Sequence, residues 1–441
     1  MAPQQHSNLP VSYRVKLKND GVMSPNPTWK KVIKFGLVAW VSLLILASCD
    51  DETEPFEAST YLWAPAIKVE KGDGEAKIGL LDPTIFALYV YPGPARPSHF
   101  TIFKSDDMEN FSEYETVDSE TTSVLIKDLE NDKPYYFFVT ASRKDFPSVN
   151  SDTLMIIPSA KFERDTYTPA PSGPFERFSI SFDGTYALYR DSHRYYQFKS
   201  SEPDQPQLVD NQTYTATWSP NANKLVYVKN IFVESAAYPS SINIYDAESL
   251  TSTTLLTIPD RSYLVSSPVF TPDGNKITYL STEGNADDLI YDLWSIDIET
   301  QEKIKLSDFG TVNFITNHPF AWSKSGEEIF VSGGYNVYGT GIHKFNVSTK
   351  VLTPVIVSKW GDKYPVISPD GNTIAFVSYR SGEDELWTYD LSTSKYRQIT
   401  GESGDNFRSP YSEIQWLDED RVLTSVSRDN QIHLVTLRVT Q

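Results

Sequence analysis

The chain of 441 residues contains only one cysteine, four methionines and six histidines. A single cysteine excludes any disulfide within the chain, so packing alone must stabilise the fold. The sequence also lacks an HExxH motif, paired cysteines, a GxSxG motif and a glycine-rich phosphate loop. It therefore indicates no catalytic residues, no metal site and no cofactor.

Long hydrophobic runs are nearly absent as well. The longest covers residues 35–47, and its 13 residues are too few to span a bilayer as a helix but typical of a signal peptide. Lys30, Lys31 and Lys34 precede it, and it ends in Leu-Ala-Ser followed by Cys49. This ending resembles the lipobox of bacterial lipoproteins. The resemblance implies that residues 1–48 are a removed signal peptide and that Cys49 carries the lipid; Met23 would begin a leader of more usual length.

Residues 50–54, DDETE, are acidic and directly follow the expected lipidation site. They resemble the surface-export signal of Bacteroidota lipoproteins. The resemblance implies an outer-membrane lipoprotein, held in the membrane through its lipid and displayed on the cell surface. The alternative is that residues 49–60 are only an acidic, solvated tether on the periplasmic face.

Positive charge is scarce beyond the leader. Without the six basic and one acidic residues of 1–48, the chain keeps 33 basic and 57 acidic residues, a net charge of −24. Such a surface repels phosphate backbones, which argues against nucleic acid as a partner.

Aromatic residues are plentiful, at 13% of the chain, and favour strands. Within residues 61–158, seven short apolar segments separated by turns predict a β-sandwich. These segments are 66–70, 75–80, 85–91, 100–104, 124–126, 135–141 and 154–157. The stretch 125–141 resembles the E–F corner of fibronectin type III domains, which implies that Leu129 is the buried corner residue, that Tyr136 is the tyrosine-corner residue and that the domain is a spacer. Phe138 would follow Tyr136 at alternate spacing.

Residues 159–173 are rich in proline and serine and read as a linker. After it, six copies of an apolar strand, a turn and a second strand begin at residues 180, 218, 270, 322, 367 and 416. A spacing of 38 to 52 residues is typical of one four-stranded propeller blade. In FTPDG (270–274) and ISPDG (367–371), proline, aspartate and glycine supply the backbone angles of a tight turn.

The repeats resemble the TolB-like propellers built from WD40-like (SPDG) repeats. The resemblance implies an all-β protein with a six-bladed β-propeller over residues 174–441. It does not imply one function, because such blades serve translocation proteins, peptidase gates and sugar lyases. The last blade has only three evident strands, so we expect residues near Lys161–Tyr167 to supply its outer strand and close the ring.

A ligand site is expected where the inner strands begin, at one mouth of the propeller channel. The candidate ligand-binding residues are Tyr214, Ser267, His318, Tyr364 and Tyr411, with Arg380 and Arg428 at the ends of second strands. Aromatic and arginine side chains could stack on sugars or bind a peptide carboxylate, although tyrosines are also common in ordinary loops. His343 and His433 fall where other blades have tryptophan, so we interpret them as structural.

The sequence thus favours a non-enzymatic envelope lipoprotein that binds a protein or glycan partner through the propeller face. The alternative is a propeller enzyme, a glycan lyase or hydrolase, with a channel-mouth site around His318. A third possibility is a structural part of a larger outer-membrane assembly, in which the acidic surface meets a basic partner.

Overall fold

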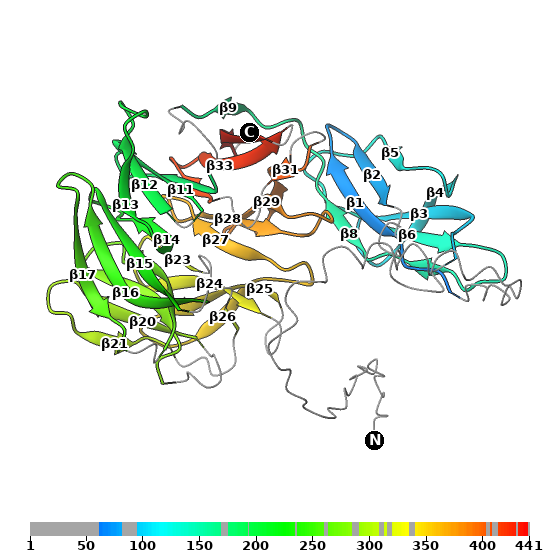
Figure 1. Cartoon of the computed structure of the whole chain (residues 1–441). Helices are drawn as coiled ribbons and strands as arrows, with labels where there is room; N and C mark the ends of the chain where they lie inside the picture. Colours follow the sequence, from blue (N-terminus) through cyan, green and yellow to red (C-terminus); the bar gives the residue numbers. More distant parts are fainter. Residues whose placement is uncertain are drawn as a thin grey trace, which may run out of the picture. The chain divides into compact units, whose positions relative to one another are not determined.

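The computed structural model describes residues 61–81, 95–168, 175–192, 194–233, 236–259, 263–284, 291–307, 313–314, 320–334, 340–402, 406–407, 413–428 and 431–439. All of them belong to one compact unit, Ser59–Gln441. Every regular element within these ranges is a β-strand (Figure 1). None of the described segments is a helix of the length and hydrophobicity needed to cross a bilayer.

Two sheets form the N-terminal part of this unit. The first has the order β1-β2-β5, and the second has the order β4-β3-β6-β7, with β8 also paired to β6. The strands of the first sheet are β1 (Ala66–Lys71), β2 (Ala76–Leu81) and β5 (Ser123–Ile126). Those of the second are β3 (His99–Ser105), β4 (Ser112–Asp118), β6 (Tyr135–Ser142), β7 (Val149–Asn150) and β8 (Leu154–Ile156). The predicted strand 85–91 lies outside the described residues.

One hydrophobic core joins these two sheets, because alternate residues of each strand point into it. Ile78 of β2 and Ile102 of β3 are fully buried there. We call this two-sheet region the sandwich domain. Its strand β4 was not predicted from the sequence, since nearly all its residues are exposed and its polar sequence has no alternating pattern.

The alternation along β6 corrects the expected tyrosine corner by one residue. Tyr135 and Phe137 are buried in the sandwich core, whereas Tyr136 and Phe138 face the other way. The hydroxyl of Tyr135 accepts a hydrogen bond of 3.0 Å from the backbone N–H of Glu130. The prediction for Tyr136 was therefore wrong, because a shift of one residue moves a strand residue to the opposite face.

Six sheets of four-strand width follow, and we number them as blades 1 to 6 (Figure 1). Blade 1 contains β10 (Arg177–Ile180), β11 (Tyr186–Asp191), β12 (Arg194–Lys199) and β13 (Gln207–Asp210). Blade 2 contains β14 (Thr213–Trp218), β15 (Lys224–Val233), β16 (Ala236–Asp246) and β17 (Thr251–Thr257). Blade 3 contains β18 (Val265–Phe270), β19 (Lys276–Ser281), β20 (Asp292–Asp297) and β21 (Lys303–Lys305).

The inner strand is interrupted in two of the remaining three blades. Blade 4 contains β22 (Asn313–Phe314), β23 (Phe320–Trp322), β24 (Glu328–Gly334), β25 (Thr340–Asn346) and β26 (Leu352–Ser358). Blade 5 contains β27 (Lys363–Ile367), β28 (Thr373–Ser378), β29 (Glu385–Asp390) and β30 (Tyr396–Gln398). Blade 6 contains β31 (Asn406–Phe407), β32 (Gln415–Trp416), β33 (Arg421–Arg428), β34 (Gln431–Arg438) and β9 (Arg164–Thr166).

Strand β9 lies on the N-terminal side of all other propeller strands, yet it is the outer strand of blade 6. It pairs antiparallel with β34, with Thr166 opposite Val435 and Arg164 opposite Leu437. This is the strand for which residues Lys161–Tyr167 were proposed from the sequence. Because the two ends of the propeller meet in one sheet, the ring is closed by backbone hydrogen bonds.

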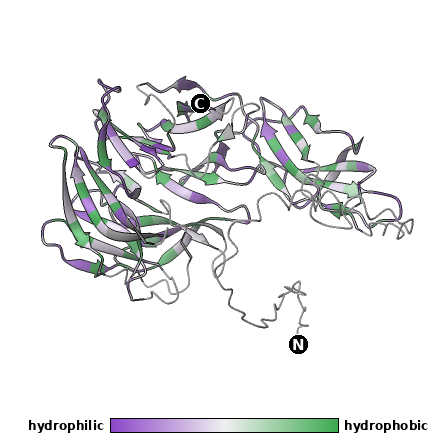
Figure 2. Ribbon diagram, viewed as in Figure 1, coloured by the Kyte–Doolittle hydropathy of each residue, from purple (hydrophilic) through white to green (hydrophobic). Residues whose placement is uncertain are grey.

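Hydrophobic side chains pack between successive blades. Figure 2 shows that hydrophobic and hydrophilic residues are interspersed along the strands. Separate clusters join blades 1 and 2, 2 and 3, 3 and 4, 4 and 5, and 5 and 6. Another cluster, with Phe178 of β10 and Leu434 of β34, joins blade 6 back to blade 1. The side-chain amide of Gln415 also bonds the backbone N–H and C=O of Ile180 at 2.9 and 2.8 Å. Side-chain packing therefore closes the same ring.

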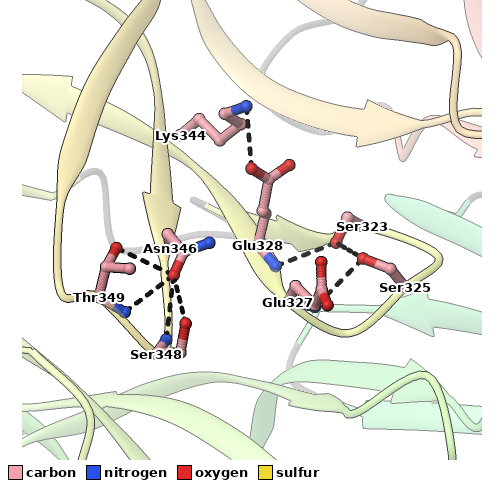
Figure 3. Close-up of polar contacts among 8 residues, drawn as sticks. All are labelled: Ser323, Ser325, Glu327, Glu328, Lys344, Asn346, Ser348 and Thr349. Carbon is pink, nitrogen blue, oxygen red and sulfur yellow. Dashed lines mark hydrogen bonds and ion pairs between the residues drawn. The ribbon is translucent and has the colours of Figure 1, made fainter.

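Turns with serine, aspartate or asparagine connect the strands of each blade, as blade 4 illustrates (Figure 3). The hydroxyl of Ser323 accepts the N–H of Glu328 at 3.1 Å. In the following hairpin, Oδ1 of Asn346 accepts the backbone N–H groups of Ser348 and Thr349 at 3.1 and 2.9 Å. These local bonds satisfy backbone groups that the strand ladders leave free, which explains why the turn residues recur in the repeats.

Candidate functional site

The inner strands of three blades share a bulge shortly before the turn motif. The pairing register shifts between Thr213 and Ala216 in β14, between Ser266 and Val269 in β18, and between Lys363 and Val366 in β27. A bulge inserts an extra residue and redirects the side chains next to it. The bulge recurs at the same position of the inner strand in three blades, so side chains at this position point in a different direction from those of a regular strand.

Two predicted site residues occupy this bulge. Ser267 and Tyr364 have φ values of 51° and 56°, in the left-handed region that non-glycine residues rarely adopt. The N–H of Tyr364 donates to the hydroxyl of Ser332 in blade 4 at 3.1 Å, so this conformation is supported from the neighbouring blade. The structure therefore places both residues at equivalent positions, four residues before the first residue of their turn motifs, Thr271 and Ser368.

The same offset in other blades identifies residues that the sequence reasoning missed. We call the set at this position the mouth ring: Arg177, Thr215, Ser267, Tyr364 and Glu413. Three of them are buried, namely Arg177, Thr215 and Ser267. The other two, Tyr364 and Glu413, are partly buried. Counting four residues back from the turn motif of each repeat would have identified Arg177 and Glu413. The two residues come together only because the ring of blades closes.

Charged groups of blades 1 and 6 meet in the mouth ring. Nη1 of Arg177 lies 3.7 Å from Oε1 of Glu413, and Nε of Arg190 lies 3.2 Å from Oε2 of Glu176. Burial raises the pKa of Tyr195, which adjoins these groups, to about 12. Tyr195 is therefore neutral at physiological pH, and the two arginines are the cations of the cluster.

Arg177 is the least satisfied of these groups. It is 5% exposed, and its Nε and Nη1 atoms are buried without a hydrogen-bond partner. Burial raises the pKa of Glu413, and Arg177 opposes the shift. A buried guanidinium with N–H groups that make no hydrogen bond can donate to a carboxylate.

Arg380, another predicted site residue, does not offer its guanidinium to a ligand in this way. Its guanidinium is 1% exposed and makes two hydrogen bonds to the carboxylate of Asp362, at 2.7 and 3.0 Å. The rings of Trp360, Phe376 and Tyr396 surround it, with the nearest ring centroid at 4.6 Å. The proposal that Arg380 faces a ligand was wrong, because its charge is buried and already paired.

The register also corrects the interpretation of one histidine. His343 pairs with Val331 and is buried at the position that Trp294 and Trp387 hold in blades 3 and 5. His433 instead pairs with Val426, and Val435 takes the tryptophan position. The long hairpin of blade 6 places His433 two residues nearer the hairpin end than the sequence alignment suggested.

The remaining predicted residues are not placed as side chains. Tyr214 lies in β14 and Arg428 ends β33, but their side chains are outside the described part of the structure. His318, Tyr411 and Cys49 lie outside the described residues altogether. Within the described ranges, no group of three histidine, cysteine, aspartate or glutamate residues is arranged to hold a metal ion.

The closed ring of six four-stranded sheets defines the class of this protein as a β-propeller. A family model, described as the TolB beta propeller domain, matches residues 211–441, more than half of the chain. The chain therefore belongs to the TolB β-propeller domain family. A comparison with curated proteins finds no match.

Solved structures with a similar fold include three bacterial proteins. The putative TolB from Agrobacterium tumefaciens is 18% identical, with 52% of this chain and 80% of that chain covered and a TM-score of 0.42. TolB from Acinetobacter baumannii is 13% identical, covering 71% and 78%, with a TM-score of 0.40. Oligogalacturonate lyase from Vibrio parahaemolyticus is 10% identical, covering 77% and 100%, with a TM-score of 0.39.

Proposed function

We propose that this protein is a non-enzymatic envelope lipoprotein that binds a carboxylate-bearing partner at the mouth ring of its propeller. The observation that carries the proposal is the buried guanidinium of Arg177, whose Nε and Nη1 atoms make no hydrogen bond within the described residues, although Nη1 lies 3.7 Å from Glu413. A TolB-like propeller fits a binding role, and the described residues contain no candidate metal site. The lipid on Cys49 would hold the protein in the outer membrane, with the cell surface as the expected face.

A carboxylate is the group that Arg177 fits best. Arginine binds carboxylates through two parallel hydrogen bonds, and such bonds are stronger in a buried site than in water. Tyr364 of the same ring adds an aromatic surface at its edge. A peptide terminus or acidic side chain and a uronate sugar both offer this chemistry, so the partner can be a protein or a glycan.

The proposal includes a fibronectin type III-like identity for the sandwich domain. Support comes from two sheets that share one core, and from the hydroxyl of Tyr135, which bonds the backbone five residues upstream. A tyrosine that bonds back to its own corner is a feature of immunoglobulin-like sandwiches. The domain has no described cluster of catalytic or metal-binding groups, so we assign it a supporting role.

Calorimetric titration tests the mouth ring directly. Two probes would be used, an acidic peptide with a free C-terminus and an oligosaccharide of uronate units. We expect at least one to bind, and Arg177→Gln to weaken its affinity about tenfold to a thousandfold, because one partner of a buried charged hydrogen bond is lost. Arg421→Gln is the matched control, since Arg421 is an exposed arginine of blade 6 paired with Asp418.

The two probes also separate the sources of the carboxylate. Binding of the peptide alone indicates a protein partner, and binding of the oligosaccharide alone indicates a glycan. Equal binding to the wild type and to Arg177→Gln would overturn the site, as would no binding of either probe. Lipidation is tested separately, because Cys49→Ser should remove the protein from the membrane fraction and abolish labelling with palmitate.

A further inference from the structure

The sandwich domain is bonded to blade 5 on the side of the propeller where the inner strands begin. The N–H of Val69 donates at 2.7 Å to the C=O of Ser381, which follows the second strand, β28. The N–H of Lys71 donates at 2.9 Å to the C=O of Gly401, which follows the outer strand, β30. In an antiparallel blade, both connections lie at the same end as the start of the inner strand, so the sandwich domain borders the face that carries the mouth ring.

The chain between the last sandwich strand, β8, and the closing strand of the propeller, β9, is bonded to both domains. The C=O of Pro158 accepts the N–H of Asp132 at 2.9 Å, and the N–H of Ser159 donates to the C=O of Gly72 at 3.1 Å. Further along, Phe162 is 3% exposed and packs into the hydrophobic cluster between blades 5 and 6. The closing strand therefore continues from a segment that is itself bound to the sandwich domain.

One carboxylate joins the sandwich domain to the closing strand. Glu402 lies in the connection from blade 5 to blade 6, and its Oε1 lies 2.9 Å from Nζ of Lys71 at the end of β1. Its Oε2 accepts a hydrogen bond of 2.8 Å from Nη2 of Arg164, the first residue of β9. The same Nζ of Lys71 donates to the hydroxyl of Ser159 at 3.0 Å and lies 4.6 Å from the ring centroid of Phe162. The three charged side chains are no more than 14% exposed, so each is costly to leave without its partner.

The closing strand has little pairing of its own. It consists of three residues, Arg164–Thr166, and pairs with β34 alone within the described residues. The outer strands of blades 3 and 5, β21 and β30, are equally short, but each follows its partner strand through a short turn. Strand β9 instead comes from the opposite end of the propeller sequence, so its pairing must overcome the entropy of closing a long loop. Contacts outside the strand pairing therefore contribute to keeping the ring closed.

We propose that the sandwich domain is a latch of the propeller ring, which holds the closing strand β9 in blade 6 through the contacts of Glu402 with Lys71 and Arg164. Displacing the sandwich domain from blade 5 is then expected to loosen β9, although the two contacts lie on different blades. The domain works as part of the ring closure and is not a freely moving spacer. The proposal does not depend on any ligand at the mouth ring.

Hydrogen exchange of the full chain, read by mass spectrometry, tests the latch with two glycine variants of blade 5. Gly382 has φ +93°, and a Cβ atom there would lie 2.7 Å from the C=O oxygen of Ile67, so Gly382→Ala should displace the sandwich domain without altering β9 or Glu402. We expect peptides containing β9 and β34 to exchange about tenfold faster or more in this variant. Gly371→Ala is the matched control for backbone strain, because Gly371 has φ +83° and no atom lies within 4 Å of its Cβ position. It should change the exchange of these peptides less than about threefold.

Glu402→Gln tests the carboxylate itself and keeps the test decisive if the Gly382 variant fails to fold. It removes the charge that Lys71 and Arg164 share, so we expect the peptides containing β9 and β34 to exchange about tenfold faster or more. Glu163→Gln is its control, because Glu163 directly precedes β9 but forms an exposed pair with Arg438 at 3.0 Å. This control should change exchange less than about twofold.

The two variants together decide the proposal. Faster exchange of β9 and β34 in Gly382→Ala and in Glu402→Gln, with both controls close to the wild type, is the expected result. Unchanged exchange of these strands in either variant would overturn the latch and leave the pairing with β34 and the apolar packing of blade 6 as the basis of ring closure.

Discussion

Blades 3 and 5 have the same strands, the same register and the same tryptophan on the third strand, but their buried charges are satisfied differently. In blade 3, Asp292 is neutralised within the blade by Lys305. In blade 5, Gln398 stands where blade 3 has Lys305, and Glu385 accepts a hydrogen bond from the hydroxyl of Thr400. A repeat can therefore conserve its backbone while a buried acid is satisfied by an ion pair in one blade and by a hydroxyl group in another.

A second pair of equivalent positions shows the same contrast. At the end of the second strand, blade 3 has Glu283, which pairs with Lys303 at 2.8 Å near the surface. Blade 5 has Arg380 at this position, buried with Asp362 and bonded through its C=O to the sandwich domain. The blade-3 pair stabilises a surface hairpin, whereas the blade-5 pair supports the domain contact.

The largest effect is expected from breaking the blade-5 pair. Arg380→Met should lower the free energy of unfolding by about 3–5 kcal/mol, because Asp362 would remain buried without its cation. Glu283→Gln, a change at the equivalent position of blade 3, should lower the free energy of unfolding by no more than about 1 kcal/mol, because the Glu283–Lys303 pair is partly exposed. Urea unfolding of both variants measures these changes. Equal losses of unfolding free energy would contradict the predicted difference between the two blades.

The second prediction concerns pH. Burial, aided by Glu383 and Glu402 and opposed by Thr400 and Lys71, raises the pKa of Glu385 to about 8, from an ordinary value of 4.5. The folded protein thus keeps a proton that the unfolded chain releases, so its free energy of unfolding falls as the pH rises from about 4.5 to 8. Glu385→Gln removes this titration and retains an acceptor for Thr400.

We therefore expect Glu385→Gln to be more stable than the wild type at pH 8, by about 4 kcal/mol, and equally stable near pH 4. Thermal or urea unfolding across this pH range measures the difference. Glu413→Gln is the comparison variant, because Glu413 is also an acid with a raised pKa but is partly buried and lies in the mouth ring. A constant difference between Glu385→Gln and the wild type at all pH values would refute the titration.

A smaller effect is expected when blade 3 is given the residue of blade 5. Lys305→Gln leaves Asp292 buried next to an amide in place of its cation. It should lower the free energy of unfolding by about 1–3 kcal/mol at pH 7. If Lys305→Gln is as stable as the wild type, Asp292 does not need a cation at this position, as Glu385 does not with Gln398 in blade 5.

The smallest effect concerns the sandwich domain alone. Tyr135→Phe should lower the free energy of unfolding by about 1 kcal/mol, because the N–H of Glu130 loses its acceptor. Tyr136→Phe is the adjacent control and should have less effect, since the corner bond is made by Tyr135. The reverse result in urea unfolding would restore the original assignment of Tyr136.

The repeated turn motif was enough to predict six blades, because its residues satisfy the backbone locally and recur at a regular spacing. The closing strand was also accessible, since the last repeat lacked a partner for its outer edge. Arg380 was misjudged because its environment comes from Trp360 and Asp362, about 20 residues earlier, and from Tyr396 of a different strand. The position of Arg380 at the end of a strand does not reveal that its side chain is buried and paired by residues from other segments.

The pairing of Arg177 with Glu413 was equally hidden. The two residues are far apart in the chain and meet only because blade 6 closes against blade 1. A one-residue error at Tyr136 arose for a different reason, since YYFFV (135–139) is apolar on both faces and its phase is set by the cores on either side. Local patterns thus predict the strands, and ring closure determines the site.

The central claim is that the propeller mouth binds its partner through Arg177. Crosslinking in whole cells, followed by recovery of the tagged protein and mass spectrometry, tests it most directly when the wild type is compared with Arg177→Gln and Arg421→Gln. We expect a partner, protein or glycan, that is recovered with the wild type and with Arg421→Gln and is reduced about tenfold or more with Arg177→Gln. Equal recovery of every partner with Arg177→Gln would contradict it.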